Sequence, residues 1–557
     1  MQKTKKVVSV LIAALFMVSM LAACSKGNDK NAGATSTPLQ TVSNESATPE
    51  EALNPEDKFK DPMEISIGYW EIGSAFQQPD KDELLQFLQK KFNITMKPRQ
   101  VGWADYMEKY KVWAASGELP DISSINIAND NRALYNSWTS QGVVRTLPDD
   151  LSQYPNLSKG LESADVQAMK TNGKFYMYPR LTYPTPDVWQ GDRAILVRKD
   201  WMDKLGISDP KSFDDFSKML KSFAEKDPDG NNKQDTVGLE SHSISHLTYL
   251  AISTLPQFAS TSWLLEDGKW IPPYASKQFP EVLKQLRQLV TDNAIDKDFA
   301  ILKGNEALEK FAQGRAGAFS YAVSPLNLKI LADAWDKYNP DKKFTDTVKV
   351  LPLWPAADGN VYHFSVTTPW SESYFSKNVD DKKMDRILSL YDYLVSPEGQ
   401  ILTTYGIEGK DYTKDGDTFV ITRPKDEKTN QPLALAASYP SLAVLGTLVT
   451  WGQEKSYLDN EINKVNFGAD NLKFAIAEYD YLTKNTKSID QNFAVNAIST
   501  PAKDGLSYNV GDDVIKIMLS KEDPTKMWQD LIKGYNTKGL AEAITELNAK
   551  VAELGIK

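Results

Sequence analysis

The chain has 557 residues, of which 41% are hydrophobic and 25% are charged, proportions typical of a soluble globular protein with two or three domains. Its formal net charge is −10, and it is more negative still without the lysines of the N-terminal segment. Such an acidic chain argues against a protein that binds nucleic acids or anionic membrane surfaces.

Residues 1–23 have the pattern of a signal peptide. Three lysines precede an apolar run over residues 7–21, which is short for a membrane span, and two alanines lead to Cys24. A short membrane anchor is the alternative interpretation, but Cys24 is the only cysteine of the chain and stands at the expected cleavage position. The pattern resembles the lipobox of bacterial lipoproteins, which implies that Cys24 becomes the diacylated first residue of an exported protein. Residues 24–60 are rich in Ser, Thr, Asn, Gly and Pro, so they are predicted to form a disordered tether.

The first folded segment alternates between strand and helix patterns. Residues 63–69 alternate as a strand that ends before Trp70, and residues 82–92 and 105–115 carry apolar side chains at helical spacing. Such alternation predicts parallel strand pairing and an α/β architecture. Ligands of open α/β sheets bind at the carboxyl ends of strands, so Trp70 and residues 125–129 are placed at a candidate ligand site.

A Pro-rich break at residues 181–186 follows another strand-like stretch, residues 173–179, and predicts a crossing between two lobes. The second lobe is predicted to begin with a strand at residues 194–197 and a short helix. Ser212 then has the position of an N-cap for an amphipathic helix over residues 213–223.

An acidic loop after this helix has oxygen-bearing side chains at alternate positions. Positions one, three, five, seven and nine of an EF-hand-like loop would be held by Asp227, Asp229, Asn231, the Lys233 carbonyl and Asp235. The match is incomplete, because the glycine stands at position four and position twelve is Gly238 rather than a bidentate Glu. A polar turn is the alternative, but three neighbouring carboxylates need a counter-charge, so the loop predicts a structural calcium ion.

Later segments continue the alternation. Helices are predicted at residues 279–292, 305–313 and 384–394, and strand-like alternation is present at residues 361–367. A hairpin is predicted around Gly416, and the remainder of the chain is predicted to be mainly helical.

Several motifs in this order resemble the extracellular solute-binding proteins of carbohydrate ABC transporters, in particular the alginate-oligosaccharide-binding proteins and the LplA-type lipoproteins of Gram-positive bacteria. Besides the lipobox at Cys24, the motifs are Ser-Gly-Glu-Leu-Pro-Asp at 116–121, Gly-Lys-Phe-Tyr-Met-Tyr-Pro at 173–179, Val-Arg-Lys-Asp-Trp at 197–201, the loop at 227–238 and Tyr-Gly-Ile-Glu-Gly at 405–409. The resemblance covers most of the chain after residue 62.

The resemblance implies an α/β fold of the type II periplasmic-binding-protein-like kind, in which two lobes joined by a hinge close on a ligand in the cleft between them. The chain of such proteins crosses between the lobes more than once, so each lobe is expected to be discontinuous. We expect residues 61–185 and 345–425 in the N-lobe and residues 186–344 and 426–557 in the C-lobe. The resemblance also implies that the acidic loop matches the calcium loop of the alginate-binding relatives, although Thr236 stands where those relatives have an acidic residue.

Sugar recognition needs flat aromatic faces together with polar groups, and the chain has 13 Trp and 24 Tyr. Most of these must be structural, and Trp201 on the face of a predicted helix is assigned to packing. Residues at predicted strand ends or crossings are better candidates. The candidate ligand-binding residues are Trp70, Asp121, Asn126, Trp189, Arg198, Tyr321, Trp370 and Trp451. Arg198 has an alternative role as the partner of neighbouring carboxylates.

The predicted function is to capture an oligosaccharide by hinge closure and deliver it to the permease subunits of an ABC importer. The protein is expected to be a monomer, lipid-anchored on the outer face of the cell membrane. Hydrolysis of ATP would belong to other subunits, since the chain has no GxxxxGK[ST] motif.

Two alternatives remain open. A secreted glycosidase or lyase is the first, because paired carboxylates far apart in sequence cannot be recognised. Against it, the chain has only three histidines and no GxSxG motif, and His242 and His246, spaced for one helix face, lack the Glu of an HExxH motif. The second is a binding protein for peptides or another non-sugar solute, which the aromatic content disfavours.

Overall fold

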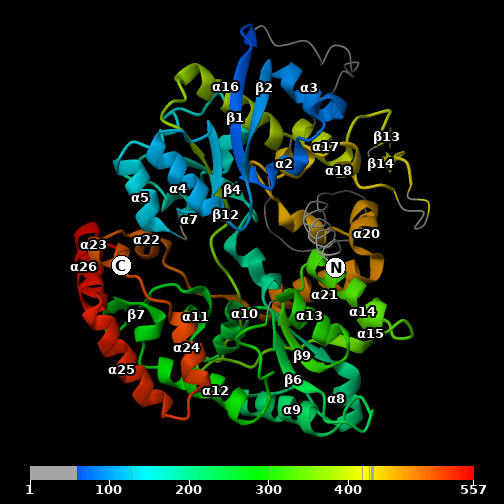
Figure 1. Cartoon of the computed structure of the whole chain (residues 1–557), viewed down its shortest axis with the longest axis vertical. Coiled ribbons are helices and arrows are strands. Elements are labelled where there is room, and N and C mark those ends of the chain that lie inside the picture. Colours follow the sequence, from blue (N-terminus) through cyan, green and yellow to red (C-terminus); the bar gives the residue numbers. More distant parts are fainter. Residues whose placement is uncertain are drawn as a thin grey trace, which may run out of the picture.

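The structure, a computed structural model, describes residues 59–556 except 129–130, 303, 417, 426 and 428–431. The predicted signal peptide, Cys24 and nearly all of the predicted tether lie outside these described residues. The chain forms two lobes, each built around its own β-sheet (Figure 1). Within the described part of the chain, none of the helices combines the length and the apolar character needed to cross a bilayer.

The sheet of the first lobe has five strands in the order β2-β1-β3-β12-β4. Their bounds are β1 Met63–Trp70, β2 Ile94–Val101, β3 Ile122–Ile125, β4 Met177–Leu181 and β12 Pro369–Phe375. β1 pairs in parallel with β2 and β3, whereas β12 runs antiparallel to β3 and β4. The carboxyl ends of the first four strands and the amino end of β12 therefore meet at one edge of the sheet.

Apolar side chains pack against both faces of this sheet. One core cluster joins Ile65 and Ile67 of β1 to α3 and α16, and another joins Ile125 of β3 to α4 and α5. The helices of this lobe are α2 Ile72–Ala75, α3 Glu83–Lys91, α4 Tyr106–Ser116, α5 Arg132–Ser140, α6 Pro155–Lys159, α7 Ala164–Gln167, α16 Asp381–Val395, α17 Pro397–Tyr405, α18 Leu435–Ser438 and α19 Leu442–Leu445. A hairpin of β13 (Tyr412–Asp415) and β14 (Thr418–Ile421) extends from it.

The sheet of the second lobe has four strands in the order β10-β5-β9-β6. Their bounds are β5 Ala194–Arg198, β6 Val237–Ser241, β9 Ala316–Tyr321 and β10 Val348–Val350. β6 and β9 are parallel, and β5 runs antiparallel to β9 and β10. The amino end of β5, which follows the crossing from the first lobe, thus lies at the same edge as the carboxyl ends of β6 and β9.

The helices of the second lobe include the C-terminal ones, which flank it in Figure 1. Their bounds are α8 Lys199–Leu205, α9 Phe213–Glu225, α10 Ile244–Thr248, α11 Pro256–Ser260, α12 Phe279–Thr291, α13 Gly304–Ala312, α14 Pro325–Tyr338, α15 Phe344–Thr347, α20 Glu461–Phe467, α21 Ala469–Asn485, α22 Phe493–Ala497, α23 Pro501–Asp504, α24 Val510–Leu519, α25 Pro524–Thr537 and α26 Leu540–Leu554. Short strand pairs are β7 Leu264–Glu266 with β8 Lys269–Ile271, and β11 Tyr362–His363 with β15 Lys487–Ser488.

The strongest sequence patterns form the expected elements. The predicted helix after Ser212 is α9, and the Ser212 hydroxyl accepts the N–H of Asp215 at 3.1 Å as its N-cap. Other patterns are only partly realised. β4 begins at Met177 rather than at residue 173, and residues 361–367 form only the two-residue strand β11.

The chain passes between the lobes at three places within its described part. It goes from β4 to β5, returns between β10 and β12, and leaves the first lobe again between α19 and the short helix η7 (Gln453–Tyr457). Two of these crossings differ from the expected boundaries. β10 pairs with β5, so the chain is still in the second lobe after residue 345. Residues 435–449 pack in the core of the first lobe, so that lobe continues past residue 426. Strand pairing decides the first boundary and core packing the second, and both join segments distant in sequence, which local patterns do not show.

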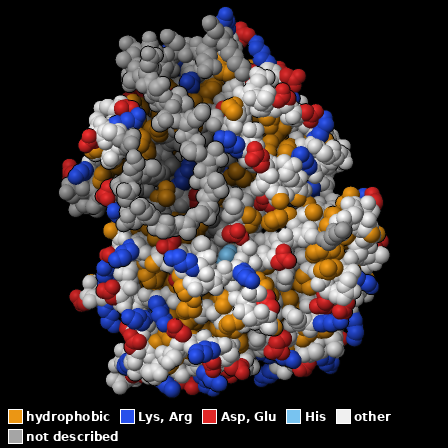
Figure 2. Space-filling model, turned by 180° about the vertical axis from the view of Figure 1, so that it is seen from behind, with side chains coloured by type: hydrophobic (Ala, Val, Ile, Leu, Met, Phe, Trp, Pro, Cys, Tyr) orange, Lys and Arg blue, Asp and Glu red, His pale blue; other side chains and the backbone are white. Residues whose placement is uncertain are grey.

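Charged groups of both signs are distributed over the molecular surface. On the face in Figure 2, Lys and Arg side chains lie between Asp and Glu side chains over most of the lower part of the molecule. The acidic net charge is therefore spread out on this face.

Candidate ligand-binding site

Three of the predicted tryptophans lie together at the carboxyl edge of the first sheet. Trp70 ends β1, and Trp370 is the second residue of β12. The backbone N–H of Trp451 donates to the Leu181 carbonyl oxygen at the end of β4. The ring centroid of Trp370 lies 5.3 Å from that of Trp70 and 5.9 Å from that of Trp451. The strand order brings them together, because the amino end of β12 and the carboxyl ends of β1 and β4 share this edge.

Two further aromatic residues complete what we call the aromatic cluster, which consists of Trp70, Trp103, Tyr106, Trp370 and Trp451. Trp103 follows β2 and stacks on Trp370 with 5.7 Å between centroids and 15° between ring planes. Tyr106 begins α4, 5.8 Å from Trp103 and 5.7 Å from Trp70. Trp103 is 55% exposed, so the stack presents a free aromatic face to solvent. Such a face binds the apolar side of a sugar ring.

Arg180 of β4 lies within the aromatic cluster. Its guanidinium carbon is 4.8, 5.0 and 5.5 Å from the ring centroids of Trp451, Trp370 and Trp70. The side chain is only 4% exposed, and this burial lowers the pKa of the Arg180 guanidinium from its usual value. A buried cation is thus surrounded by aromatic faces, the arrangement of a cation–π cage.

Polar groups adjoin the cluster. Asn126 directly follows β3, and its side-chain oxygen accepts the hydroxyl of Tyr106 at 2.9 Å. The indole N–H of Trp70 is buried and has no hydrogen-bond partner among the described residues. A buried donor without a partner is uncommon in proteins.

The second lobe places Tyr321 and two histidines at its own carboxyl edge. Tyr321 ends β9, and its ring centroid lies 5.2 Å from that of His242, which follows β6. The ring of His246 lies 5.0 Å from that of His242. The two histidines are not on one helix face, since α10 begins only after His242. Burial lowers the pKa of both imidazoles, which keeps them neutral.

Trp189 lies between the lobes as a packing residue. Its ring meets that of Tyr183 edge to face with 4.8 Å between centroids, and its indole N–H donates to the carbonyl oxygen of Thr367 at 2.8 Å. Tyr183 and Thr367 belong to two different crossing segments, so Trp189 connects these two segments of the hinge.

Arg198 and Asp121 do not join the candidate site. Arg198 is the last residue of β5, far from the edge where that strand begins, and it binds both carboxylate oxygens of Asp200 at 2.7 and 2.6 Å. Asp121 precedes β3 and accepts the N–H of Ser66 at 2.8 Å and the amine of Lys383 at 3.0 Å. Both side chains have local ionic or hydrogen-bond partners. Position in the sequence alone did not show which end of a strand lies at the ligand edge of its sheet.

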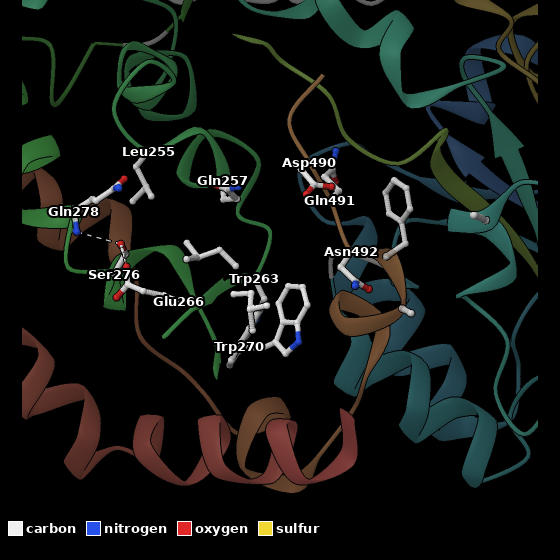
Figure 3. Close-up of a pocket in the computed structure, with 15 residues that line it drawn as sticks. Leu255, Gln257, Trp263, Glu266, Trp270, Ser276, Gln278, Asp490, Gln491 and Asn492 are labelled. Carbon is white, nitrogen blue, oxygen red and sulfur yellow. Dashed lines mark hydrogen bonds between the residues drawn. The ribbon is translucent and has the colours of Figure 1, made fainter. Parts of the chain in front are cut away.

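A pocket of about 830 Å³ is lined by residues of both lobes (Figure 3). The β7–β8 hairpin region, with Trp263 and Trp270, faces Asp490, Gln491 and Asn492 across it. Ala164 of α7 contributes to its lining from the first lobe. The pocket therefore combines aromatic and polar side chains and borders both lobes.

The acidic loop after α9 brings its oxygen atoms together. The Asn231 amide donates to Asp229 Oδ2 at 2.7 Å and to Asp235 Oδ1 at 3.0 Å, and the Asn232 N–H donates to Asp227 Oδ2 at 3.0 Å. Burial and the neighbouring Asp227 carboxylate raise the pKa of Asp229, because negative charges there are close together. Among the described residues no three His, Cys, Asp or Glu side chains are grouped as a metal site. The carboxylate oxygens of Asp227, Asp229 and Asp235 are nonetheless donors that calcium takes, whereas the amide oxygen of Asn231 accepts the N–H of Lys233 at 2.7 Å.

The structure explains why position twelve of this loop lacks a ligand. A β-carbon on Gly238 would lie 2.3 Å from the carbonyl oxygen of Ala294 and 2.5 Å from that of Leu220. Close packing of β6 against α9 thus excludes a side chain there.

Trp103, Tyr106 and Arg180 are not among the candidates predicted from the sequence. β2, which leads to Trp103, has apolar Ile94, Met96 and Val101 but contains a proline and several polar residues, so its pattern is weak. Arg180 follows the strand-like stretch that ended at residue 179. An extension of that strand by two residues would have placed Arg180 near the ligand edge.

Comparisons with known proteins identify the family. Residues 68–401 match the family described as bacterial extracellular solute-binding protein. The chain belongs to this family. As a solute-binding protein it is not an enzyme, as the sequence predicted, and the family is extracellular.

The relatives of this solute-binding protein include YtcQ of Bacillus subtilis strain 168, a polygalacturonan/rhamnogalacturonan-binding protein. YtcQ is 28% identical over 408 residues, which cover 71% of this chain and 78% of YtcQ. Among solved structures, the alginate-binding protein AlgQ2 without calcium ion has a TM-score of 0.63 at 15% identity, with 88% of this chain and 98% of AlgQ2 covered. An EF-hand mutant of FusA from Streptococcus pneumoniae, in complex with fructo-nystose, has a TM-score of 0.60 at 18% identity, with 88% and 99% covered. These likenesses confirm the predicted periplasmic-binding-protein-like fold.

Proposed function

We propose that this solute-binding protein captures an oligosaccharide between its lobes and delivers it to the permease of an ABC importer. The observation that carries the proposal is the aromatic cluster, with Trp103 exposed and stacked on Trp370 at the edge where ligands of α/β sheets bind. YtcQ and FusA, whose ligands are sugars, support a sugar as the ligand class.

Capture would proceed by closure of the lobes. A ligand that contacts the aromatic cluster and the facing edge with Tyr321 and His242 stabilises the closed arrangement by its higher affinity for it. The crossing segments around Trp189 absorb the rotation. We propose further that Cys24 carries a lipid anchor, that the residues after it form the tether, and that a monomer works on the outer face of a Gram-positive cell membrane.

Titration calorimetry of the full chain against a panel of neutral and acidic oligosaccharides tests the proposal. We expect at least one of them to bind, with no product formed. Trp103→Ala is expected to weaken this binding by about 1–3 kcal/mol, because a stacking face is lost. The melting temperature should stay near that of the wild type, since Trp103 is largely exposed.

Tyr338→Ala is the matched control, because Tyr338 is also an exposed aromatic residue but ends α14 in the other lobe. It should leave the affinity unchanged. Equal affinities of the wild type and Trp103→Ala would remove the aromatic cluster from the binding site, and binding of peptides alone would replace the sugar proposal.

We also propose that Asp227, Asp229, Asn231, the Lys233 carbonyl and Asp235 bind a structural calcium ion. The carboxylates of Asp229 and Asp235, which accept hydrogen bonds from the same Asn231 amide group, and the raised pKa of Asp229 support it. Two structures with the same fold add support, since one is described as AlgQ2 without calcium ion and the other as an EF-hand mutant of FusA. The ion would hold the loop between α9 and β6 in place.

Thermal unfolding with and without calcium tests this site. Calcium that binds only the folded state raises the melting temperature, and Asp229→Ala should abolish the rise. Asp336→Ala, which removes an exposed carboxylate from α14, should keep it. An equal rise in both variants would place calcium elsewhere.

A further inference from the structure

The charge of Arg180 has no carboxylate in direct contact within the described residues. The side chain is 4% exposed, and the hydrogen bonds that it donates go to two hydroxyls and one backbone carbonyl. Arginine stays protonated in proteins, so a full positive charge is buried here. Burial of a charge is costly unless it is paired and hydrogen-bonded.

The hydrogen bonds of Arg180 leave one nitrogen unused. Nε donates to the Ser371 hydroxyl at 2.7 Å. Nη1 donates to the Tyr69 hydroxyl at 2.9 Å and to the Thr447 carbonyl oxygen at 3.4 Å. Nη2, which carries two N–H groups, has no partner among the described residues. The guanidinium is therefore held in place by its other two nitrogens while Nη2 remains available.

Among the described residues, Glu372 of β12 is the carboxylate whose charge raises the pKa of Arg180 against the effect of burial. Its carboxylate is already engaged. Oε2 accepts the N–H groups of Ile127 and Ala128 at 3.1 and 3.4 Å and the hydroxyl of Tyr374 at 3.2 Å. Glu372 thus orients the residues that follow β3 and does not form an ion pair with Arg180.

A purely structural role accounts for only part of this arrangement. The rings of Trp70, Trp370 and Trp451 stabilise the cation by their faces, but they accept no hydrogen bond from Nη2 in the plane of the guanidinium. A caged arginine with unused donors beside a sugar-stacking face matches a ligand that has an anionic group attached to its ring. The acidic net charge of the chain, −10, makes such a local cation necessary for an anionic ligand.

We infer that Arg180 selects acidic sugars: Nη2 binds the carboxylate of a uronic acid residue whose ring stacks on the aromatic cluster. This inference rests on the proposed function and specifies the ligand class. The relatives do not decide whether this chain prefers acidic or neutral sugars. The inference rests on the unpaired charge of Arg180 within the aromatic cluster. Neutral oligosaccharides would leave the buried cation without a partner, so they bind more weakly.

The experiment compares matched acidic and neutral sugars on the full chain by titration calorimetry. The panel contains oligogalacturonates, alginate oligosaccharides and xylo-oligosaccharides that bear glucuronate, each with a counterpart whose carboxyl groups are reduced to hydroxymethyl groups. We expect the acidic member of the bound pair to bind about 30-fold more tightly than its neutral counterpart, as for other buried charge pairs.

Three variants assign that preference to Arg180. Arg180→Gln should abolish it, and Arg180→Lys should keep part of it, because the charge remains but the planar donor group is lost. Arg315→Gln is the control, since Arg315 is exposed at the amino end of β9 and its loss changes the net charge equally. Melting temperatures show whether each variant is folded. If Arg180→Gln fails to fold, the wild-type pairs and Arg180→Lys carry the test.

The outcomes separate this inference from the proposed function. Equal affinity of the wild type for an acidic sugar and its neutral counterpart, or a preference that survives in Arg180→Gln, would overturn the role of Arg180 while leaving a sugar-binding protein. Failure of every sugar in the panel to bind would overturn the proposed function itself, and the inference with it.

Discussion

Glu240 of β6 is completely buried, and its carboxyl group lies beside the carboxylate of Asp296 and the amine of Lys310. Lys310 Nζ is 2.6 Å from Asp296 Oδ2 and 3.6 Å from Glu240 Oε1, so Asp296 is its closer partner. Burial, together with the Asp296 carboxylate, raises the pKa of Glu240 to about 9. The neighbouring Glu240 carboxyl group and the Lys310 amine, which donates to Asp296 Oδ2 at 2.6 Å, lower the pKa of Asp296. Glu240 therefore keeps its proton at neutral pH, and Asp296 carries the charge.

This raised pKa makes stability depend on pH. The unfolded chain releases the Glu240 proton near pH 4.5, whereas the folded chain retains it up to about pH 9. The contribution of Glu240 to stability is therefore complete below the lower value and is lost progressively as the pH rises toward the higher one. Glu240→Gln, which cannot ionise, should raise the melting temperature relative to the wild type, and the difference should grow between about pH 5 and about pH 8.

Glu225→Gln is the control, since Glu225 is exposed at the end of α9. Its melting temperature should follow that of the wild type at every pH. A constant difference between Glu240→Gln and the wild type across this range would mean that Glu240 is ionised in the folded protein.

Among single residues, the sequence located part of the candidate site. Trp70, Asn126, Trp370 and Trp451 were selected because they lie at predicted strand ends or near predicted crossings, and the structure gathers them at one edge. The same criterion also selected Arg198, which lies at the far end of β5, because the direction of a strand within its sheet depends on its partners. Arg180 was missed because its role depends on the rings of three tryptophans that come from distant segments.

Between neighbouring helices and strands, the packing of β6 against α9 depends on Gly238. One of its α-hydrogens faces the carbonyl oxygens of Ala294 and Leu220, and a methyl group in its place would be closer than atoms can approach. Gly238→Ala should therefore destabilise the protein by about 1–3 kcal/mol, because two backbone segments must move apart. Chemical denaturation measures this loss.

Gly534 provides a matched comparison for the same substitution. It lies inside α25, and no neighbouring segment comes within 4 Å of the place that a β-carbon would take. Gly534→Ala should stabilise the protein by about 0.5–1 kcal/mol, because alanine favours the helix. If both variants lose stability equally, close packing at Gly238 is not the cause.

Helices and strands were predicted correctly from the sequence where one face of the segment is buried and the other is exposed. α9 shows its apolar stripe at helical spacing because Phe216, Leu220 and Phe223 all enter the core of the second lobe. β2 lies at the edge of its sheet and alternates only at its start. Residues 361–367 alternate without a sheet to join, so that only two of them pair, with β15.

Over the molecule as a whole, the two-lobe fold was implied by the order of the motifs, and the first crossing was expected at residues 181–186, but the two later crossings were not located. The boundary expected at residue 345 fails because β10 joins β5, a strand far earlier in the chain, to complete the second sheet. Each crossing is set by such long-range pairing. The closure that we propose thus depends on contacts between segments distant in sequence.

One such contact joins the first lobe to the C-terminal helices. The amide of Asn136 in α5 donates to the Ser499 hydroxyl at 2.5 Å and to Asp504 Oδ2 at 3.3 Å. Asp504 ends α23, which packs against α26, and α26 packs against β8 of the second lobe. The contact therefore favours the arrangement in which the lobes are near each other.

Asn136→Ala should shift the free protein toward a more open arrangement. Loss of about 1 kcal/mol of hydrogen bonding changes the ratio of open to closed forms about fivefold. Small-angle scattering should show a larger radius of gyration for the free variant, and the sugar affinity should fall by the same factor, because closure costs more. Saturation with ligand should restore the wild-type scattering. Ser140→Ala, at the exposed end of the same helix, should change neither quantity. Unchanged scattering and affinity in Asn136→Ala would show that this contact does not bias closure.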